Sequence, residues 1–258
     1  MGIKGKFFAL LLCLTLICGS LASCDVLDRL QSGTKRDADK YEAEVRVVFA
    51  TNDEKLSDAV NAMNSSATIK ADGENMSVVT TAKSNDTTVT ETYTVLDGRL
   101  YHFLSVQSGT YYADKREQAD FSDTDTYMLL SEIGTGADID ITDFETSRES
   151  DGANEKKTYT CSDITDQARE GLHASISDKF APLGATVNIK DVTFILEVEG
   201  DLEMKTTLSC DLEIIMSGNS YEITMRTYTT YDYDANPEIS APSNSDTYKE
   251  VSYKDILG

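Results

Sequence analysis

Apolar and polar residues alternate along most of this chain, a pattern typical of β-strands with one buried and one solvated face. The first alternating run begins at Tyr41 and places four apolar residues on one face: Ala43, Val45, Val47 and Phe49. Residues 66–113 repeat the pattern in shorter runs and predict a β-meander. Between two of these runs, Asp97-Gly98 predicts a type I′ hairpin turn, because both central residues of that turn need a positive φ.

The longest alternating runs lie in the C-terminal half. Residues 192–198 form one, Gly200-Asp201 turns the chain, and residues 202–216 form the next before a turn at Gly218-Asn219. A strand of about 14 residues is far longer than the usual five or six. A long strand with one apolar face must twist and curl around whatever covers that face. The alternatives for this cover are a helix, a partner or a ligand.

Two segments have helical spacing. Residues 165–181 carry apolar residues at every fourth position: Ala168, Leu172, Ile176 and Phe180. Thr165 can cap this helix. A shorter helix is expected after Thr51-Asn52-Asp53-Glu54, which fits a capping box. The sequence therefore predicts an α+β fold, in which one or two helices cover a curved, mostly antiparallel sheet shaped as a half-open barrel.

The N-terminal segment has a different pattern. Lys4 and Lys6 precede an apolar run from Phe7 to Cys18, which is too short for a bilayer span of about 20 residues. Small residues follow it, as in a secretory signal peptide. The stretch Leu21-Ala22-Ser23-Cys24 resembles the lipobox of bacterial lipoproteins. The resemblance implies that diacylglycerol is attached to the Cys24 sulfur and that the chain is cut before Cys24. The alternative is an ordinary secretory signal with a chance cysteine.

This interpretation divides the chain into four parts: a signal peptide at 1–23, a flexible tether at 24–40, a domain at 41–235 and a loosely held tail at 236–258. Some residues of the tail are expected to dock on the domain: Tyr248, Val251 and Tyr253. Two acyl chains give stable anchoring, whereas one gives only marginal binding. We therefore expect a lipid-anchored protein on the extracytoplasmic face of the cell membrane.

The charge of the chain excludes some partners. It has 45 acidic and 23 basic residues and a formal net charge of −22, which argues against binding nucleic acid or anionic head groups. Most acidic residues alternate with apolar ones, as on a solvated outer face. A group of aspartates forms either a solvated loop or a calcium site, although it lacks the glycine and distant glutamate of an EF-hand: Asp120, Asp123, Asp125, Asp138, Asp140 and Asp143.

No catalytic set stands out in the sequence. The histidines, His102 and His173, have no cluster at metal-ligand spacing around them and are expected at the surface or at a strand edge. A Gly-x-Ser-x-Gly elbow and a phosphate-binding glycine loop are absent. We therefore expect no enzyme, no cofactor and no bound metal.

Cysteines and tyrosines each leave two alternatives open. Cys161 and Cys210 lie at inward strand positions and form either a disulfide, which an extracytoplasmic compartment permits, or two separately buried thiols. The tyrosines near the end of the last long strand either make a sugar or protein contact or serve cross-strand packing: Tyr228, Tyr231 and Tyr233.

The order of these elements resembles the half-open β-barrel lipoproteins, such as the LolA/LolB lipoprotein carriers and the mycobacterial LppX/LprG-type lipid carriers. The stretches Val95–Phe103 (VLDGRLYHF) and Gly109–Lys115 (GTYYADK) are also similar to uncharacterised lipoproteins of Firmicutes. In the carrier families a concave sheet, lidded by helices, binds acyl chains. The resemblance implies that this chain binds a lipid or other amphiphile.

The long one-faced strands supply the residues expected to line such a site: Phe194, Leu196, Met204, Leu208, Leu212, Ile214, Ile223 and Met225. Methionine in this lining suits a ligand of variable shape. The alternative function is a non-enzymatic envelope interaction or sensor module with a solid core, which contacts an envelope protein through its loops and tail.

Overall fold

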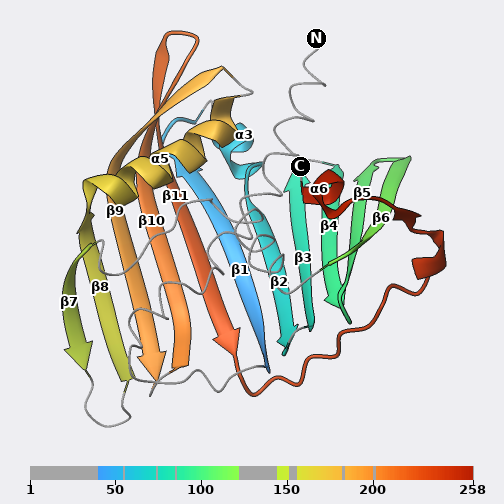
Figure 1. Cartoon of the computed structure of the whole chain (residues 1–258). Coiled ribbons are helices and arrows are strands. Elements are labelled where there is room, and N and C mark those ends of the chain that lie inside the picture. Colours follow the sequence, from blue (N-terminus) through green and yellow to red (C-terminus); the bar gives the residue numbers. More distant parts are fainter. Residues whose placement is uncertain are drawn as a thin grey trace.

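The computed structural model describes residues 40–54, 56–73, 75–84, 86–121, 144–150, 156–181, 184–199 and 202–257. These residues build one large, curved and open sheet (Figure 1). Its long strands are β1 (Lys40–Thr51), β2 (Ser65–Asp72), β3 (Asn75–Ser84), β4 (Thr87–Leu96), β5 (Arg99–Ser108), β6 (Tyr111–Asp120), β7 (Phe144–Ser150), β8 (Lys156–Ile164), β9 (Ala185–Glu199), β10 (Leu202–Met216) and β11 (Asn219–Asp232). The two-residue strand β12 (Lys249–Glu250) completes it.

The sheet consists of two meanders joined by the first strand. Its order is β12-β6-β5-β4-β3-β2-β1-β11-β10-β9-β8-β7. β1 therefore pairs with β2 on one side and with β11 on the other, and both pairings are antiparallel. The predicted curved, mostly antiparallel sheet of an α+β fold is confirmed.

Two of the predicted turns can be compared with the structure, and the third, Gly200-Asp201, lies outside the described residues. Asp97 and Gly98 have φ values of 51° and 75°, which are the positive values that a type I′ turn needs. The turn between β10 and β11 uses Ser217 and Gly218, with φ values of 53° and 80°. It lies one residue earlier than predicted, because Asn219 already belongs to β11.

One face of the sheet carries the core, and we call it the inner face. In β1 the buried positions are the four predicted ones, Ala43, Val45, Val47 and Phe49, each at most 1% exposed. The other face, called the outer face, carries the residues between them, which are mostly exposed. The same alternation in β2, β3, β10 and β11 extends one continuous core across the sheet.

Helix α5 (Asp166–Phe180) lies across β9, β10 and β11 in Figure 1 and matches the predicted helix at 165–181. The short helix α3 (Ser57–Asn61) also forms, but the predicted capping box does not. Helix α3 begins after Leu56, which makes no side-chain cap. The Thr51 hydroxyl instead accepts a hydrogen bond from Asp53 N and donates one to Glu222 O of β11.

The C-terminal tail closes one edge of the sheet. It runs from β11 to the far edge (Figure 1), where it forms the short helix η4 (Ser245–Thr247), then β12, which pairs in parallel with β6, and finally α6 (Tyr253–Leu257). Tyr248 is 9% exposed and packs edge-on against Tyr101, and Tyr253 packs edge-on against Phe121. Val251 N donates a hydrogen bond to Gln118 O. The predicted docking of Tyr248, Val251 and Tyr253 is confirmed, and it holds the tail more firmly than its polar sequence suggests.

None of the helices in the described ranges is long and apolar enough to cross a membrane. The expected signal peptide, the lipidated Cys24 and all of the expected tether except Lys40 lie outside the described residues.

Candidate functional site

The residues predicted to line a ligand site come together on the inner face of β9, β10 and β11. All of them except Met204 are buried, with exposures from 0% for Leu196 to 7% for Ile223: Phe194, Leu196, Leu208, Leu212, Ile214, Ile223 and Met225. The strand register places Phe194 opposite Leu208 and Leu212 opposite Ile223. Because the pairing is antiparallel, these opposite side chains lie on the same face and pack against each other.

Met204 departs from the predicted alternation. The register between β9 and β10 shifts between Glu203 and Lys205, so Met204 is the extra residue of a β-bulge. Glu203 takes the inward position, 5% exposed, and Met204 is only half-buried. Since the bulge changes the parity of the strand at this point, Met204 does not take the buried inward position that was predicted for it beside Leu208.

Helix α5 covers this part of the inner face. The apolar residues that it adds to the core are Leu172, Ile176 and Phe180, at 0%, 3% and 4% exposure. His173 is exposed, as predicted, and its Nε2–H donates a 2.6 Å hydrogen bond to the Val187 carbonyl of β9. An apolar stripe and a polar contact therefore hold α5 on the sheet.

Cys161 and Cys210 are free, buried thiols. Cys161 of β8 pairs with Phe194 of β9, and Cys210 of β10 pairs with Val192 of β9, so a whole strand separates the two cysteines. Two strand spacings amount to about 9–10 Å, beyond the Cα separation of roughly 7 Å that a disulfide can bridge. Burial, with a smaller contribution from the nearby Asp211 carboxylate, raises the pKa of the Cys210 thiol to about 12.

A cluster of ionisable side chains lies on the inner face of β4, β5 and β6. His102 Nε2 is 2.9 Å from Glu91 Oε1, and His102 Nδ1 is 3.6 Å from Glu117 Oε2. The Tyr93 hydroxyl donates to Glu91 at 2.7 Å, and its ring stacks on His102 at 4.7 Å. Lys115 Nζ is 2.7 Å from Glu117 Oε2. His102 and Tyr93 thus both contact the Glu91 carboxylate, whereas His102 Nδ1 is buried without a hydrogen-bond partner among the described residues.

This cluster corrects the prediction for His102, which is 4% exposed and lies on the inner face of β5, an interior strand with β4 and β6 on either side, rather than at the surface or at an edge. Sequence reasoning also missed Glu91 and Glu117, which are 8% and 7% exposed. A signal was present, since Glu91 lies between the inward Val89 and Tyr93 and so has the parity of the core face. Charge alone suggested exposure, whereas position in the strand indicated burial.

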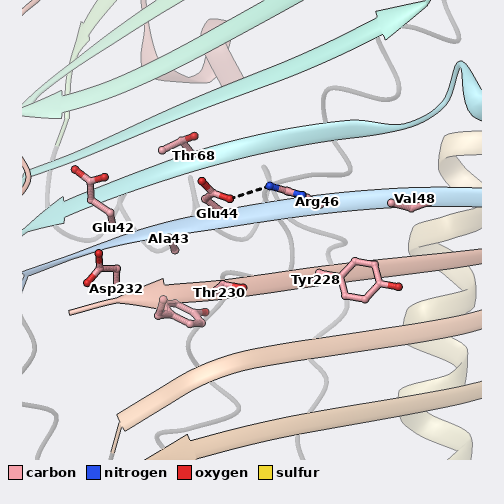
Figure 2. A pocket seen from close by; sticks show the side chains of 10 residues that line it. Glu42, Ala43, Glu44, Arg46, Val48, Thr68, Tyr228, Thr230 and Asp232 are labelled. Carbon is pink, nitrogen blue, oxygen red and sulfur yellow. Dashed lines mark hydrogen bonds and ion pairs between the residues drawn. The ribbon is translucent and has the colours of Figure 1, made fainter. Parts of the chain in front are cut away.

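The outer face is hollowed over β1 and β11 (Figure 2). This outer pocket has a volume of about 580 Å³ and is lined mainly by outward-facing side chains: Glu42, Glu44, Arg46, Val48, Thr68, Tyr228, Thr230 and Asp232. Ala43 and Tyr231 complete the lining. Glu44 accepts a 3.2 Å hydrogen bond from Arg46, and Glu42 lies 3.1 Å from Lys70 Nζ. Carboxylates therefore outnumber cations among the residues that line the pocket.

The three strand-end tyrosines separate between the two faces. Tyr231 is 4% exposed and packs edge-on against Tyr41 at 5.7 Å, while Tyr233 stacks on Tyr231 at 6.0 Å. Tyr228 lies on the outer face and lines the outer pocket. Cross-strand packing thus accounts for Tyr231 and Tyr233, and Tyr228 is the tyrosine available for a contact.

A smaller pocket of about 300 Å³ lies near the other end of the same strands, between Thr51, Lys190, Asp211 and Glu222. Lys190 Nζ donates a 2.7 Å hydrogen bond to Glu222, which raises the pKa of Lys190. Nearby, hydrogen bonds from Ser220 and Asn188 lower the pKa of Glu213. Carboxylates outnumber cations in this lining too, since Asp191, Asp211 and Glu222 line the pocket with Lys190.

The described residues contain no group of three or more His, Cys, Asp or Glu side chains that could hold a metal ion. Of the aspartates considered for calcium, Asp120 is exposed and lies 3.5 Å from Arg99. The others lie outside the described residues: Asp123, Asp125, Asp138, Asp140 and Asp143.

Comparisons with known proteins add no functional assignment. No family model matches the chain, and no curated protein matches it. Among solved structures, the ywiB protein from Bacillus subtilis is similar over 74% of this chain and 92% of its own, at 9% identity and a TM-score of 0.21. The acyl-CoA thioesterase II TesB2 from Mycobacterium marinum is similar over 88% and 90%, at 9% identity and a TM-score of 0.15. These TM-scores are too low to support any argument about this chain.

Proposed function

We propose that this chain is a lipid-anchored extracytoplasmic protein that binds a lipid or other amphiphile on the inner face of its sheet, which acts as a half-open barrel. Cys24 carries the anchor. The ligand's apolar part lies against the long strands β9, β10 and β11, under α5. The protein catalyses no reaction on its ligand.

The observation that carries this proposal is that α5 covers the apolar face of the long strands β9, β10 and β11 with few apolar side chains of its own. The helix has 15 residues, yet the large apolar side chains that it buries are Leu172, Ile176 and Phe180. Most of its remaining residues are polar or charged. Fully burying such a side chain contributes about 1.5–3 kcal/mol, and fixing the helix in place costs conformational entropy. An apolar ligand that covers the same sheet surface would compete with the helix for these contacts.

The surface beneath α5 suits such an exchange. Phe194, Leu208 and Met225 present aromatic, branched and flexible side chains on neighbouring strands, and a flexible thioether adapts to ligands of different shape. An acyl chain would replace the contacts of the helix with contacts of the same apolar kind. The exchange therefore leaves the apolar surface covered in both states.

The ligand is tested with a photoactivatable fatty acid supplied to cells that make the full chain. After irradiation, cross-linked peptides are identified by mass spectrometry. We expect cross-links on inward positions of β9, β10 and β11, in addition to label carried by the anchor. Cross-links confined to the anchor, with none on these strands, would refute the inner-face site.

The anchor is tested separately by labelling with a fatty acid that carries a reporter group. We expect the full chain to incorporate the label, and the Cys24→Ser variant to lose it. Cys18→Ser removes a cysteine from the same segment and is the matched control, which should keep the label. A labelled Cys24→Ser variant would refute lipidation at this residue without bearing on the inner face.

One observation favours the second candidate function, an envelope interaction or sensor module with a solid core. With α5 in place, the predicted lining residues other than Met204 already belong to one continuous buried cluster. A ligand-free protein would be stable in that state and would make its contacts through its loops and tail. The cross-linking experiment distinguishes the two functions, because a solid core excludes the fatty acid from β9, β10 and β11.

A further inference from the structure

We propose that the amphiphile on the inner face carries an uncharged oxygen acceptor, such as an ester carbonyl, which the hydroxyls of Thr227 and Thr229 bind. This inference rests on the proposed function and adds the chemical class of the ligand and its direction on the sheet. The ester group would lie at the two threonines, and the acyl chain would run from there towards α5.

Two hydroxyl groups are buried in the core of the sheet without a hydrogen bond. Thr227 and Thr229 are 1% and 0% exposed and occupy neighbouring inward positions of β11. Neither Oγ1 atom has a hydrogen-bond partner in the part of the chain that the structure describes. Burying a hydroxyl without a partner is costly, and buried polar groups of folded proteins nearly always have one. The pair therefore points to a partner that the described residues do not supply.

The spacing of the two hydroxyls suits one ester group. Residues two apart on a strand have Cα atoms about 7 Å apart. An ester has two oxygen atoms on one carbon, so it can accept one hydrogen bond of about 2.8 Å on each side. Thr206 of β10 is the register partner of Thr229 and brings a third hydroxyl, on a residue that is 6% exposed, to the same place. Three threonines thus form a polar spot on the apolar inner face.

The surroundings of this spot favour an uncharged group over an anion. Val47 and Leu208 are the register partners of Thr227, and Val45 is the β1 partner of Thr229. All three are at most 1% exposed. A carboxylate or phosphate held here would lose its water without gaining a cation beside it, which is costly. A neutral carbonyl needs only the hydrogen bonds that the hydroxyls can donate.

The position of α5 sets the direction of the acyl chain. The helix is hydrogen-bonded to the Val187 carbonyl of β9, and the register of the sheet places Val187 level with Tyr221 of β11. Thr227 is six residues further along β11, which corresponds to about 20 Å. The buried inward residues between these two levels are Ile223 and Met225. An acyl chain that starts at the threonines would lie over them and end under α5.

The test compares two ligands on the full chain: methyl dodecanoate, which is an ester, and n-dodecane, which has no oxygen. Thr227→Val and Thr229→Val each remove one hydroxyl and keep the shape of the side chain. Each change should weaken binding of the ester about two- to tenfold, the size of one neutral hydrogen bond. Binding of dodecane should stay the same or become tighter. The infrared carbonyl stretch of the bound ester should lie at lower frequency in the unchanged protein than in the double variant, because hydrogen bonding weakens the carbonyl bond.

Ser84→Ala is the matched control for the loss of a buried hydroxyl. Ser84 Oγ is also buried without a partner among the described residues, but it lies on β3, which β2 and β1 separate from β11. All three changes should raise the urea midpoint of the ligand-free protein, because each removes an unsatisfied group. Only the threonine changes should weaken ester binding. A lower midpoint for the threonine variants would show that their hydroxyls already have a partner, such as a buried water, and would overturn the proposal.

The outcomes separate this site from the proposed function. The proposal is wrong if the threonine changes affect the ester and dodecane equally, if Ser84→Ala weakens ester binding as much, or if dodecanoate binds more tightly than its methyl ester. Fatty-acid cross-links on β9, β10 and β11 would still support amphiphile binding in each of these cases. If neither ligand binds and those cross-links are absent, the inner-face function fails and this proposal fails with it.

Discussion

The attachment of α5 to the sheet can be tested by truncating Leu172, which is 0% exposed in the core. Leu172→Ala removes apolar carbon atoms that are worth about 0.8 kcal/mol per buried CH₂ and leaves a cavity. Leucine-to-alanine changes at such sites cost about 2–5 kcal/mol. Because alanine and leucine are both strong helix formers, helix propensity contributes little to the difference. We expect a loss of about 2–5 kcal/mol in the stability of the packed helix.

Two measurements separate local release of α5 from global unfolding. Urea denaturation reports the global free energy, and hydrogen exchange reports opening of α5 alone. If α5 detaches as a cover, its amides should exchange faster by more than tenfold, since 1.4 kcal/mol corresponds to a factor of ten. Amides in the β10–β11 ladder should change less than those of α5.

Glu170→Ala is the matched control on the same helix, because Glu170 is exposed. Surface substitutions of this kind usually stay within about 0.5 kcal/mol. A Leu172→Ala effect no larger than that of Glu170→Ala would refute the packing of α5 on the inner face. Equal acceleration of exchange in α5 and in the β10–β11 ladder would refute the idea that α5 opens by itself.

Other predictions concern the buried groups and one turn. His102→Ala removes the partner that Glu91 and Glu117 share, while Tyr93 and Lys115 still contact them, and should cost about 1–3 kcal/mol in urea denaturation. Gln107→Ala at an exposed position of the same strand should cost under about 0.5 kcal/mol, and equal effects would contradict the network. Cys161 and Cys210 should both react with a thiol reagent only after unfolding, so a reactive native thiol among them would contradict their burial. Because the Cys210 pKa is raised from 9.0 to about 12, its contribution to stability is complete below about pH 9 and is lost as the pH rises towards 12; Cys210→Ala should flatten this part of a stability–pH profile, and an unchanged slope would argue against the shift. Gly98→Ala, at a φ of 75°, should cost about 1 kcal/mol or more, and Gly98→Asn should cost less because asparagine tolerates a positive φ.

Local patterns account for much of this fold. Alternation assigned Ala43, Val45, Val47 and Phe49 to the core, because side chains of a strand point to opposite faces with a strict period of two. Spacing of four predicted α5, and Asp97-Gly98 predicted its turn, because both depend on neighbouring residues only. The packed inner face of β9, β10 and β11 follows from the same alternation.

Pairing between distant strands decided the rest. Whether Cys161 and Cys210 could meet depended on β9 lying between their strands, and no property of either cysteine encodes that order. The inward position of Glu203 came from a bulge against β9, which a single strand does not reveal. His102 and the two glutamates became a cluster because β4, β5 and β6 are neighbours in register, and the outer pocket arose because β1 pairs with β11 from the other end of the domain. Periodicity is a local property and can be read along the chain, whereas register and strand order come from contacts far apart in sequence.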